Sequence, residues 1–259
     1  MSTSAEPRTS GVTNGGHNGF SERQYAELNT WQHQTRVVLQ PISAPSVLGL
    51  FAFAVATFIV TADYVSWFGT LKTQSVIFPF AVATGGLMQS LAAVWSYRAR
   101  DTLATAVHGM WGGFWIAYGI LWGFVVSGAI ALPAGYAVIS GLNYWFFTMA
   151  AVTLVCAVAA MGQNMALTLL LLLLGSGAAL LGVAMTVGGS TWYYVGGYVT
   201  MASAIAALYT GGAMLIAATW GRTVLPIGTL GRRQENIPGK QPMTPIEFVA
   251  GEPGVRQGQ

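Results

Sequence analysis

The sequence predicts an all-α polytopic membrane protein, a bundle of six transmembrane helices preceded by a short N-terminal amphipathic helix. Only 7% of the 259 residues are charged and 54% are hydrophobic, whereas about 25% of the residues of a soluble domain are charged. The mean hydropathy is +0.56. No Asp, Glu, Lys or Arg occurs between Asp101 and Arg222. Lipid-facing helices require such a stretch, and a soluble fold could not cover it with solvated surface.

Residues 1–43 are predicted to form a cytoplasmic tail. Residues 1–19 are rich in Ser, Thr, Gly and Asn, which is typical of disorder. Ser21 and Gln24 then fit a capping box, and apolar and aromatic residues follow at three-residue spacing, which predicts a short helix at the membrane interface. The tail lacks the apolar core of a signal peptide, so the first span is expected to direct its own insertion. Residues 222–259 are expected to form a second cytoplasmic tail.

Residues 44–221 are predicted to form the transmembrane domain. It contains six hydrophobic segments, each long enough to cross about 30 Å of hydrocarbon at about 1.5 Å per residue. The predicted spans are Val47–Trp67, Val76–Tyr97, Thr102–Ser127, Tyr136–Met161, Met165–Val187 and Trp192–Trp220. The break between the fourth and fifth spans rests on length, because neither a charge nor a proline marks it.

The distribution of basic residues predicts the orientation. With six spans, both tails and the loops after the second and fourth spans lie on one side of the membrane. That side carries ten of the eleven Lys and Arg residues, and the opposite side carries only Lys72. The positive-inside rule therefore places both termini in the cytoplasm and predicts a multi-pass protein of the inner or plasma membrane.

The sequence lacks the side chains that membrane enzymes and cofactor proteins need. Haem held between two histidines requires a pair, and only His108 lies in a span. Retinal requires an intramembrane lysine, whereas Lys72 and Lys240 lie outside the spans. Cys156 is the single cysteine, which excludes an intramolecular disulfide. We therefore expect no enzyme activity, no cofactor and no metal. The basic residues form no aromatic-interleaved patch, so we also expect no nucleic-acid partner.

Neutral hydroxyl and amide side chains remain inside or beside the spans. They are Thr57, Thr61, Thr84, Gln89, Asn143, Thr148, Gln163, Asn164 and Thr210. Such groups hydrogen-bond either a passing polar solute or a neighbouring helix. Gln89 lies one turn after Gly85 and Gly86, and a role in a solute path and a role in packing are equally compatible with this position. His108 is expected at the interfacial end of the third span, with a proton relay as the alternative.

Two motifs stand at the ends of the predicted domain, one at Pro45, Leu48, Gly49 and Leu50 and the other at 221–228. Both resemble motifs of the acetate uptake transporter family, which includes the bacterial succinate–acetate permeases. The segment 221–228 is similar to the C-terminal signature of that family, through Gly221, Arg222, Leu225, Pro226 and Gly228. The start of the first span is similar to the family's Asn-Pro-Ala-Pro-Leu-Gly-Leu motif, with matches at Pro45, Leu48, Gly49 and Leu50.

Shorter motifs in between also fit the family, so the resemblance covers residues 43–230. They are Gly85–Gln89, Asp101–Thr102, Gly112–Trp115 and Asn164. The resemblance implies a solute path inside each protomer, hexameric assembly, and an apolar constriction formed by Phe53, Trp111 and Leu174. Trp111 stands where relatives often carry Tyr. With Gln89, Thr57 and Asn164, these residues are the candidate path.

The resemblance implies a permease or channel for acetate and related short-chain carboxylates, with succinate as a further candidate. The solute could pass as its protonated acid, which lowers the desolvation cost at an apolar constriction. Proton-coupled and passive transport both stay open. Two other functions are compatible with the sequence. One is an accessory or scaffold subunit of a membrane complex, and the other is a channel for a small neutral solute or ammonium.

Overall fold

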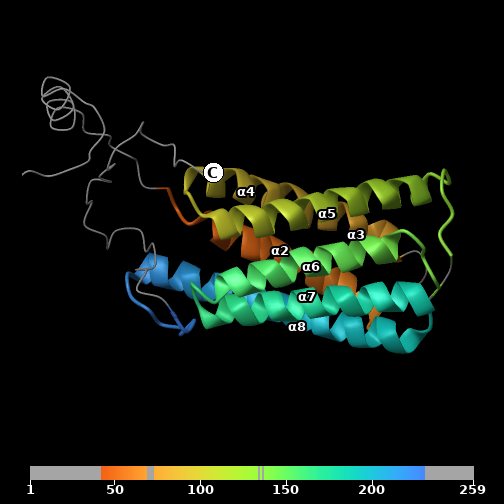
Figure 1. The fold of residues 1–259 in the computed structure, drawn as a ribbon. Coiled ribbons are helices and arrows are strands. Elements are labelled where there is room, and N and C mark those ends of the chain that lie inside the picture. The colour runs from red at the N-terminus through yellow and green to blue at the C-terminus, as the bar shows by residue number, and fades with distance from the viewer. Residues whose placement is uncertain (1–41, 69–72, 134, 136, 231–259) are drawn as a thin grey trace, which may run out of the picture. The chain divides into compact units, whose positions relative to one another are not determined.

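The computed structural model describes residues 42–68, 73–133, 135 and 137–230, and these residues form an all-helical domain (Figure 1). Six helical segments are long and apolar enough to cross a membrane, so the predicted six-span fold is confirmed. The helices are α2 (Pro45–Tyr64), α3 (Thr73–Ala81), the π-helix η1 (Val82–Met88), α4 (Gln89–Arg98), α5 (Thr102–Val126), α6 (Leu142–Ala160), α7 (Met165–Val187) and α8 (Ser190–Trp220). The elements α3, η1 and α4 together make the second span. The predicted amphipathic helix lies outside the described residues.

The predicted limits agree with the helices except at the start of the fourth span. That span was expected from Tyr136, but α6 begins at Leu142. The described residues just before α6 are not helical, and their backbone bonds elsewhere, since Ile139 N donates to Met185 O at 3.0 Å. Asn143 Oδ1 then accepts from Gly141 N at 3.0 Å. The prediction placed the start of this span too early because the loop residues are about as apolar as those of the helix.

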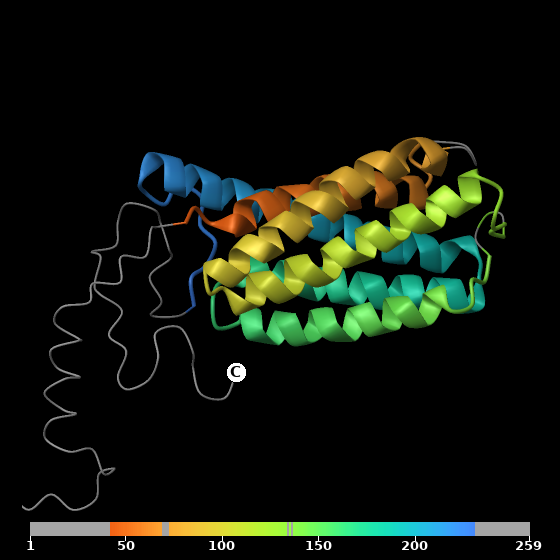
Figure 2. The same ribbon diagram turned by 90° about the horizontal axis from the view of Figure 1, so that it is seen from above.

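The six spans run side by side along one direction in both views (Figures 1 and 2). Helix α2 packs against α8 and against the second span, while α6, α7 and α8 pack in succession. Glycines allow α7 and α8 to approach closely, since a Cβ at Gly196 would lie 2.9 Å from Leu181 N. Small residues at such positions are the usual means of tight packing between transmembrane helices.

The second span changes its helical pitch near the middle of the domain. Pro79 lies inside α3, where it removes a backbone donor, and the π-helix η1 follows. Gly85 lies in this segment, and a Cβ there would be 2.5 Å from Trp115 Cγ and 2.8 Å from Ala56 Cβ. The glycine therefore lets the second span approach α5 and α2 closely, just before Gln89.

Candidate functional site

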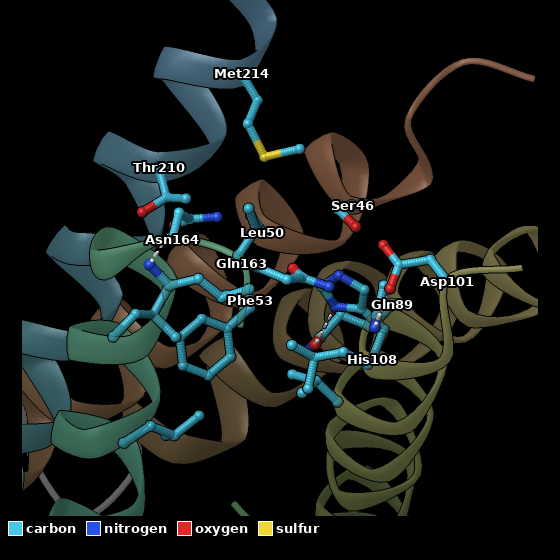
Figure 3. A pocket seen from close by; sticks show the side chains of 16 residues that line it. Ser46, Leu50, Phe53, Gln89, Asp101, His108, Gln163, Asn164, Thr210 and Met214 are labelled. Atoms are coloured by element: carbon cyan, nitrogen blue, oxygen red, sulfur yellow. Dashed lines mark hydrogen bonds between the residues drawn. The ribbon is translucent and has the colours of Figure 1, made fainter. Parts of the chain in front are cut away.

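The larger cavity lies at the end of the domain where α2, α5 and α7 begin, and we call it the polar cavity (Figure 3). Its volume is about 70 Å³, which gives room for about five waters or a solute of a few heavy atoms. Its polar lining residues are Ser46, Gln89, Asp101, His108, Gln163, Asn164 and Thr210. Among the described residues of this wall, Asp101 and His108 are the ones with ionisable side chains.

Gln89 and His108 lie next to each other in the wall of the polar cavity (Figure 3). Gln89 Nε2 donates to Gly85 O at 3.0 Å, and Gln89 Oε1 lies 3.5 Å from His108 Nδ1. His108 lies two turns into α5 with its side chain only 3% exposed, so it faces the interior of the bundle, while its place at the interfacial end of the span stays a prediction. A lone polar residue in an apolar helix gives no sign of which neighbours surround it, so its burial was not visible in the sequence.

The motif at the start of the first span forms the first turns of α2. Pro45 is its first residue, and Leu50 is buried and lines the polar cavity. Gly49 faces the imidazole ring of His108, and a Cβ at Gly49 would overlap that ring. Leu48 is exposed. This motif therefore provides one wall of the polar cavity and the space that His108 occupies.

The C-terminal signature segment folds back onto the start of α7. Gly228 O accepts from Met165 N at 2.8 Å, and Ile227 O accepts from Ala166 N at 3.0 Å. Asn164 Oδ1 accepts from Leu167 N at 2.8 Å. Backbone donors in the first turn of a helix lack partners within that helix, and these contacts supply them. Asn164 thus caps α7 and lines the polar cavity at the same time.

The rest of the signature segment continues these contacts. Tyr209 on α8 donates from its hydroxyl to Pro226 O at 2.7 Å, and Leu230 N donates to Gln163 O at 3.0 Å. Arg222 lies over the ring of Trp220, with its guanidinium carbon 6.0 Å from the ring centroid. The sequence identified this motif only through resemblance. The structure gives it a physical role beside the polar cavity.

Phe53, Trp111 and Leu174 are all buried. Phe53 and Leu174 line the polar cavity, whereas Trp111 lines a second, smaller cavity. The rings of Phe53 and Trp111 meet edge to face, with centroids 6.0 Å apart. The contact between Phe53 and Trp111 therefore joins the wall of one cavity to the wall of the other.

The smaller cavity, which we call the aromatic pocket, has a volume of about 20 Å³ and is lined by α2 and by α5–α8. That volume gives room for about one or two water molecules. Two polar atoms of its lining, Thr57 Oγ1 and Trp115 Nε1, are buried and have no hydrogen-bond partner in the described part of the chain. Because an unpaired buried polar group costs free energy, both atoms are available to hydrogen-bond a solute or water.

Beyond the aromatic pocket, a chain of hydrogen bonds joins three helices. Gln74 Nε2 donates to Asp63 Oδ2, and Gln74 Oε1 accepts from the hydroxyl of Tyr118. Asp63 lies in the last turn of α2, and the sequence analysis did not identify Gln74 or Tyr118. Their one signal is that an amide and a phenol in apolar segments need partners.

No group of three or more His, Cys, Asp or Glu side chains is placed to hold a metal ion among the described residues. In the same part of the chain the charged side chains are Asp63, Arg98, Arg100, Asp101 and Arg222. Both cavities are therefore lined mainly by neutral groups. Such an arrangement suits weak, reversible contact with a small polar solute.

The family model described as GPR1/FUN34/yaaH matches residues 27–230. The chain belongs to this family. It is 28% identical over 202 residues to an uncharacterized protein of Methanothermobacter thermautotrophicus, an alignment that covers 74% of this chain and 95% of that protein. It is 31% identical over 94 residues to acetate permease A of Emericella nidulans, which covers 35% of this chain and 31% of the permease.

A solved structure shares the fold of this family member. The structure is that of the bacterial acetate channel SatP, with a TM-score of 0.66 and 21% sequence identity. The match covers 73% of this chain and 100% of the channel. The similarity establishes the arrangement of the six spans.

Proposed function

We propose that this chain is a membrane permease or channel for acetate and related short-chain carboxylates, with succinate as a further candidate. Membership of the GPR1/FUN34/yaaH family supports the proposal, together with the similarity to acetate permease A and to the bacterial acetate channel SatP. The observation that carries it is the pair of cavities, of which one is lined by Phe53 and Leu174 and the other by Trp111, whose ring meets that of Phe53.

The proposed path runs from the polar cavity to the aromatic pocket. Gln89 and Asn164 line its wider part, Phe53, Trp111 and Leu174 form the constriction, and Thr57 lies beyond it. The unpaired Thr57 hydroxyl supports this order, because it offers a hydrogen bond just past the apolar section.

The apolar lining of the proposed constriction favours passage of the neutral form of the solute. Moving an ionised carboxylate into an apolar environment costs far more free energy than moving a protonated acid. Phe53, Trp111 and Leu174 provide no charge, and neither cavity is lined by a described Lys or Arg. We therefore propose that the solute crosses as its protonated acid, so that one proton accompanies each carboxylate.

The proposed domains are a transporter domain at 44–221 between cytoplasmic tails at 1–43 and 222–259. Arg98, Arg100 and Arg222 lie at the same end as the polar cavity, which supports a cytoplasmic orientation of that end under the positive-inside rule. We further propose that the protein resides in the inner or plasma membrane. Homo-oligomeric assembly, as the hexamer implied by the family resemblance, completes the proposal.

The test is uptake of labelled acetate into liposomes that contain the purified full-length protein, with empty liposomes as the control. Saturable uptake that an acidic exterior accelerates supports passage of the acid, whereas uptake indifferent to the gradient supports a passive anion channel. Competition by succinate and by ammonium then defines the solute class. If the protein liposomes take up acetate no faster than empty ones, the proposal fails and an accessory subunit becomes the better explanation.

A further inference from the structure

His108 is a buried imidazole in the wall of the polar cavity that the path described above does not use. It lies two turns into α5 after Asp101, about 10 Å along the helix at about 1.5 Å per residue. Its side chain is 3% exposed, and it lines the cavity. An ionisable side chain inside a membrane domain is rarely a packing residue alone.

The surrounding residues hold the ring in one orientation. On one side lies the backbone of Gly49, where a Cβ would overlap the ring atoms. On the other side Gln89 Oε1 lies 3.5 Å from His108 Nδ1. Since Gln89 Nε2 is bonded to Gly85 O, the oxygen is the atom that faces His108. Nδ1 therefore carries the proton of the neutral ring, and Nε2 is left as the acceptor.

No hydrogen bond reaches His108 Nε2 from any described residue. The imidazole lines the polar cavity, which has room for a small solute. The other walls add no competing titratable group. Among the described lining residues, α2, α4, α7 and α8 contribute only neutral side chains, and Asp101 lies at the start of α5. Asp101 Oδ1 already accepts from Ala104 N at 2.9 Å.

Building on the proposed function, we propose that His108 binds the carboxyl group of a short-chain monocarboxylic acid in the polar cavity and exchanges a proton with it. The O–H bond of the incoming acid breaks, and its proton forms the N–H bond at Nε2. The resulting imidazolium and carboxylate hold each other by a charge-assisted hydrogen bond. When the imidazolium gives that proton to water at the Asp101 end, the neutral ring releases the carboxylate.

The test combines two measurements on the purified full-length protein with acetate at neutral pH. Calorimetric titration in two buffers of different ionisation enthalpy gives the number of protons taken up per bound acetate, and infrared difference spectra with carbon-13-labelled acetate show whether the ligand is a carboxylate or an acid. We expect uptake of about one proton per acetate, with the ligand bound as carboxylate. A bound protonated acid, or binding without proton uptake, would overturn the inference.

The variants assign the proton to His108. His108→Gln should bind acetate about tenfold more weakly, because it loses a charge-assisted hydrogen bond, and should take up no proton onto the protein. Ser96→Ala is the matched control, since Ser96 is a fully buried hydroxyl on α4 that does not line the cavity. It should behave as wild type. If His108→Gln takes up a proton with bound carboxylate as wild type does, the inference fails.

A second variant keeps the test decisive if His108→Gln binds no acetate. In His108→Ala, added imidazole should restore acetate binding together with proton uptake, and absence of any restoration overturns the inference. The proposed function fails separately, if wild-type liposomes exclude acetate. If the wild-type protein transports acetate but takes up no proton when acetate binds, the role proposed for His108 is wrong and the proposed function stands.

Discussion

Trp111 donates from Nε1 to Thr153 Oγ1 at 3.1 Å, which ties the largest side chain of the proposed constriction to α6. Thr153 is itself held by its hydroxyl, which donates to Met149 O at 2.7 Å. The indole is therefore anchored by a polar contact on one side and by the ring of Phe53 on the other. The anchored indole of Trp111 should therefore limit how far the proposed constriction can widen.

Thr153→Val should loosen this anchor. The substitution keeps the volume but leaves a buried indole N–H unpaired, which costs about 1–3 kcal/mol. We expect a lower melting temperature in detergent and a higher ratio of butyrate to acetate uptake. Ser176→Ala, which removes an exposed hydroxyl from α7, is the control. An unchanged uptake ratio in Thr153→Val would argue that Trp111 does not set the size limit.

Gly49→Ala should disrupt the polar cavity. Its added methyl group would overlap the His108 ring, and crowding in a packed interior costs about 1–3 kcal/mol. We expect acetate uptake to fall by about tenfold or more at equal protein content, as that free energy predicts. Gly113→Ala is the matched control, because nothing lies within 4 Å of a Cβ at that position. Equal loss in both variants would mean that the helices tolerate no added methyl group, and that the cavity is not the cause.

The Asp63–Gln74–Tyr118 chain should stabilise the far end of the domain. Gln74→Leu removes both hydrogen bonds of the Gln74 side chain, so Asp63 and Tyr118 each lose a partner. The expected cost is about 1–3 kcal/mol per buried group left unpaired, observed as a lower melting temperature of the purified protein. Thr84→Val is the control in the same span, because it removes an exposed hydroxyl that donates to Phe80 O. Its melting temperature should equal that of the wild type.

Removal of the C-terminal signature should unfold the start of α7. Deletion of 222–259 takes away the carbonyls of Ile227 and Gly228 that accept from the first donors of α7, whereas deletion of 231–259 keeps them. We expect the shorter deletion to transport acetate at the wild-type rate and the longer one to lose uptake. Gel filtration of both proteins separates misfolding from loss of the path. Full uptake by the longer deletion would show that the cap is dispensable.

External pH should set the uptake rate through the solute. A carboxylic acid with a pKa of about 4 is ionised at neutral pH, so its protonated fraction falls about tenfold for each unit of pH rise. Passage of the acid therefore predicts initial acetate uptake that decreases about tenfold per unit above pH 6 at fixed total acetate. Measurement of initial rates with equal pH on both sides checks this slope. A flat profile would indicate passage of the anion.

The sequence by itself determined the six spans. Their number follows from local hydropathy and from the length needed to cross a bilayer, so each span could be recognised without knowledge of its neighbours. The late start of α6 was missed because Ile139 pairs with Met185, a contact between residues far apart in the chain. Resemblance supplied the motifs at Gly49 and Gly228, but their partners, His108 and Met165, are also far away in the sequence.

Only the tertiary structure decided how the polar residues combine. Composition indicated that Gln89 and His108 are polar groups in apolar helices, and left open whether each served packing or a path. The close approach at Gly49 and the pitch of η1 bring these side chains together in one cavity wall. Such a juxtaposition depends on the rotation and packing of whole helices, because side-chain direction is fixed by the helix and its neighbours. Hydropathy is a property of each segment alone, and it carries no information about which faces meet.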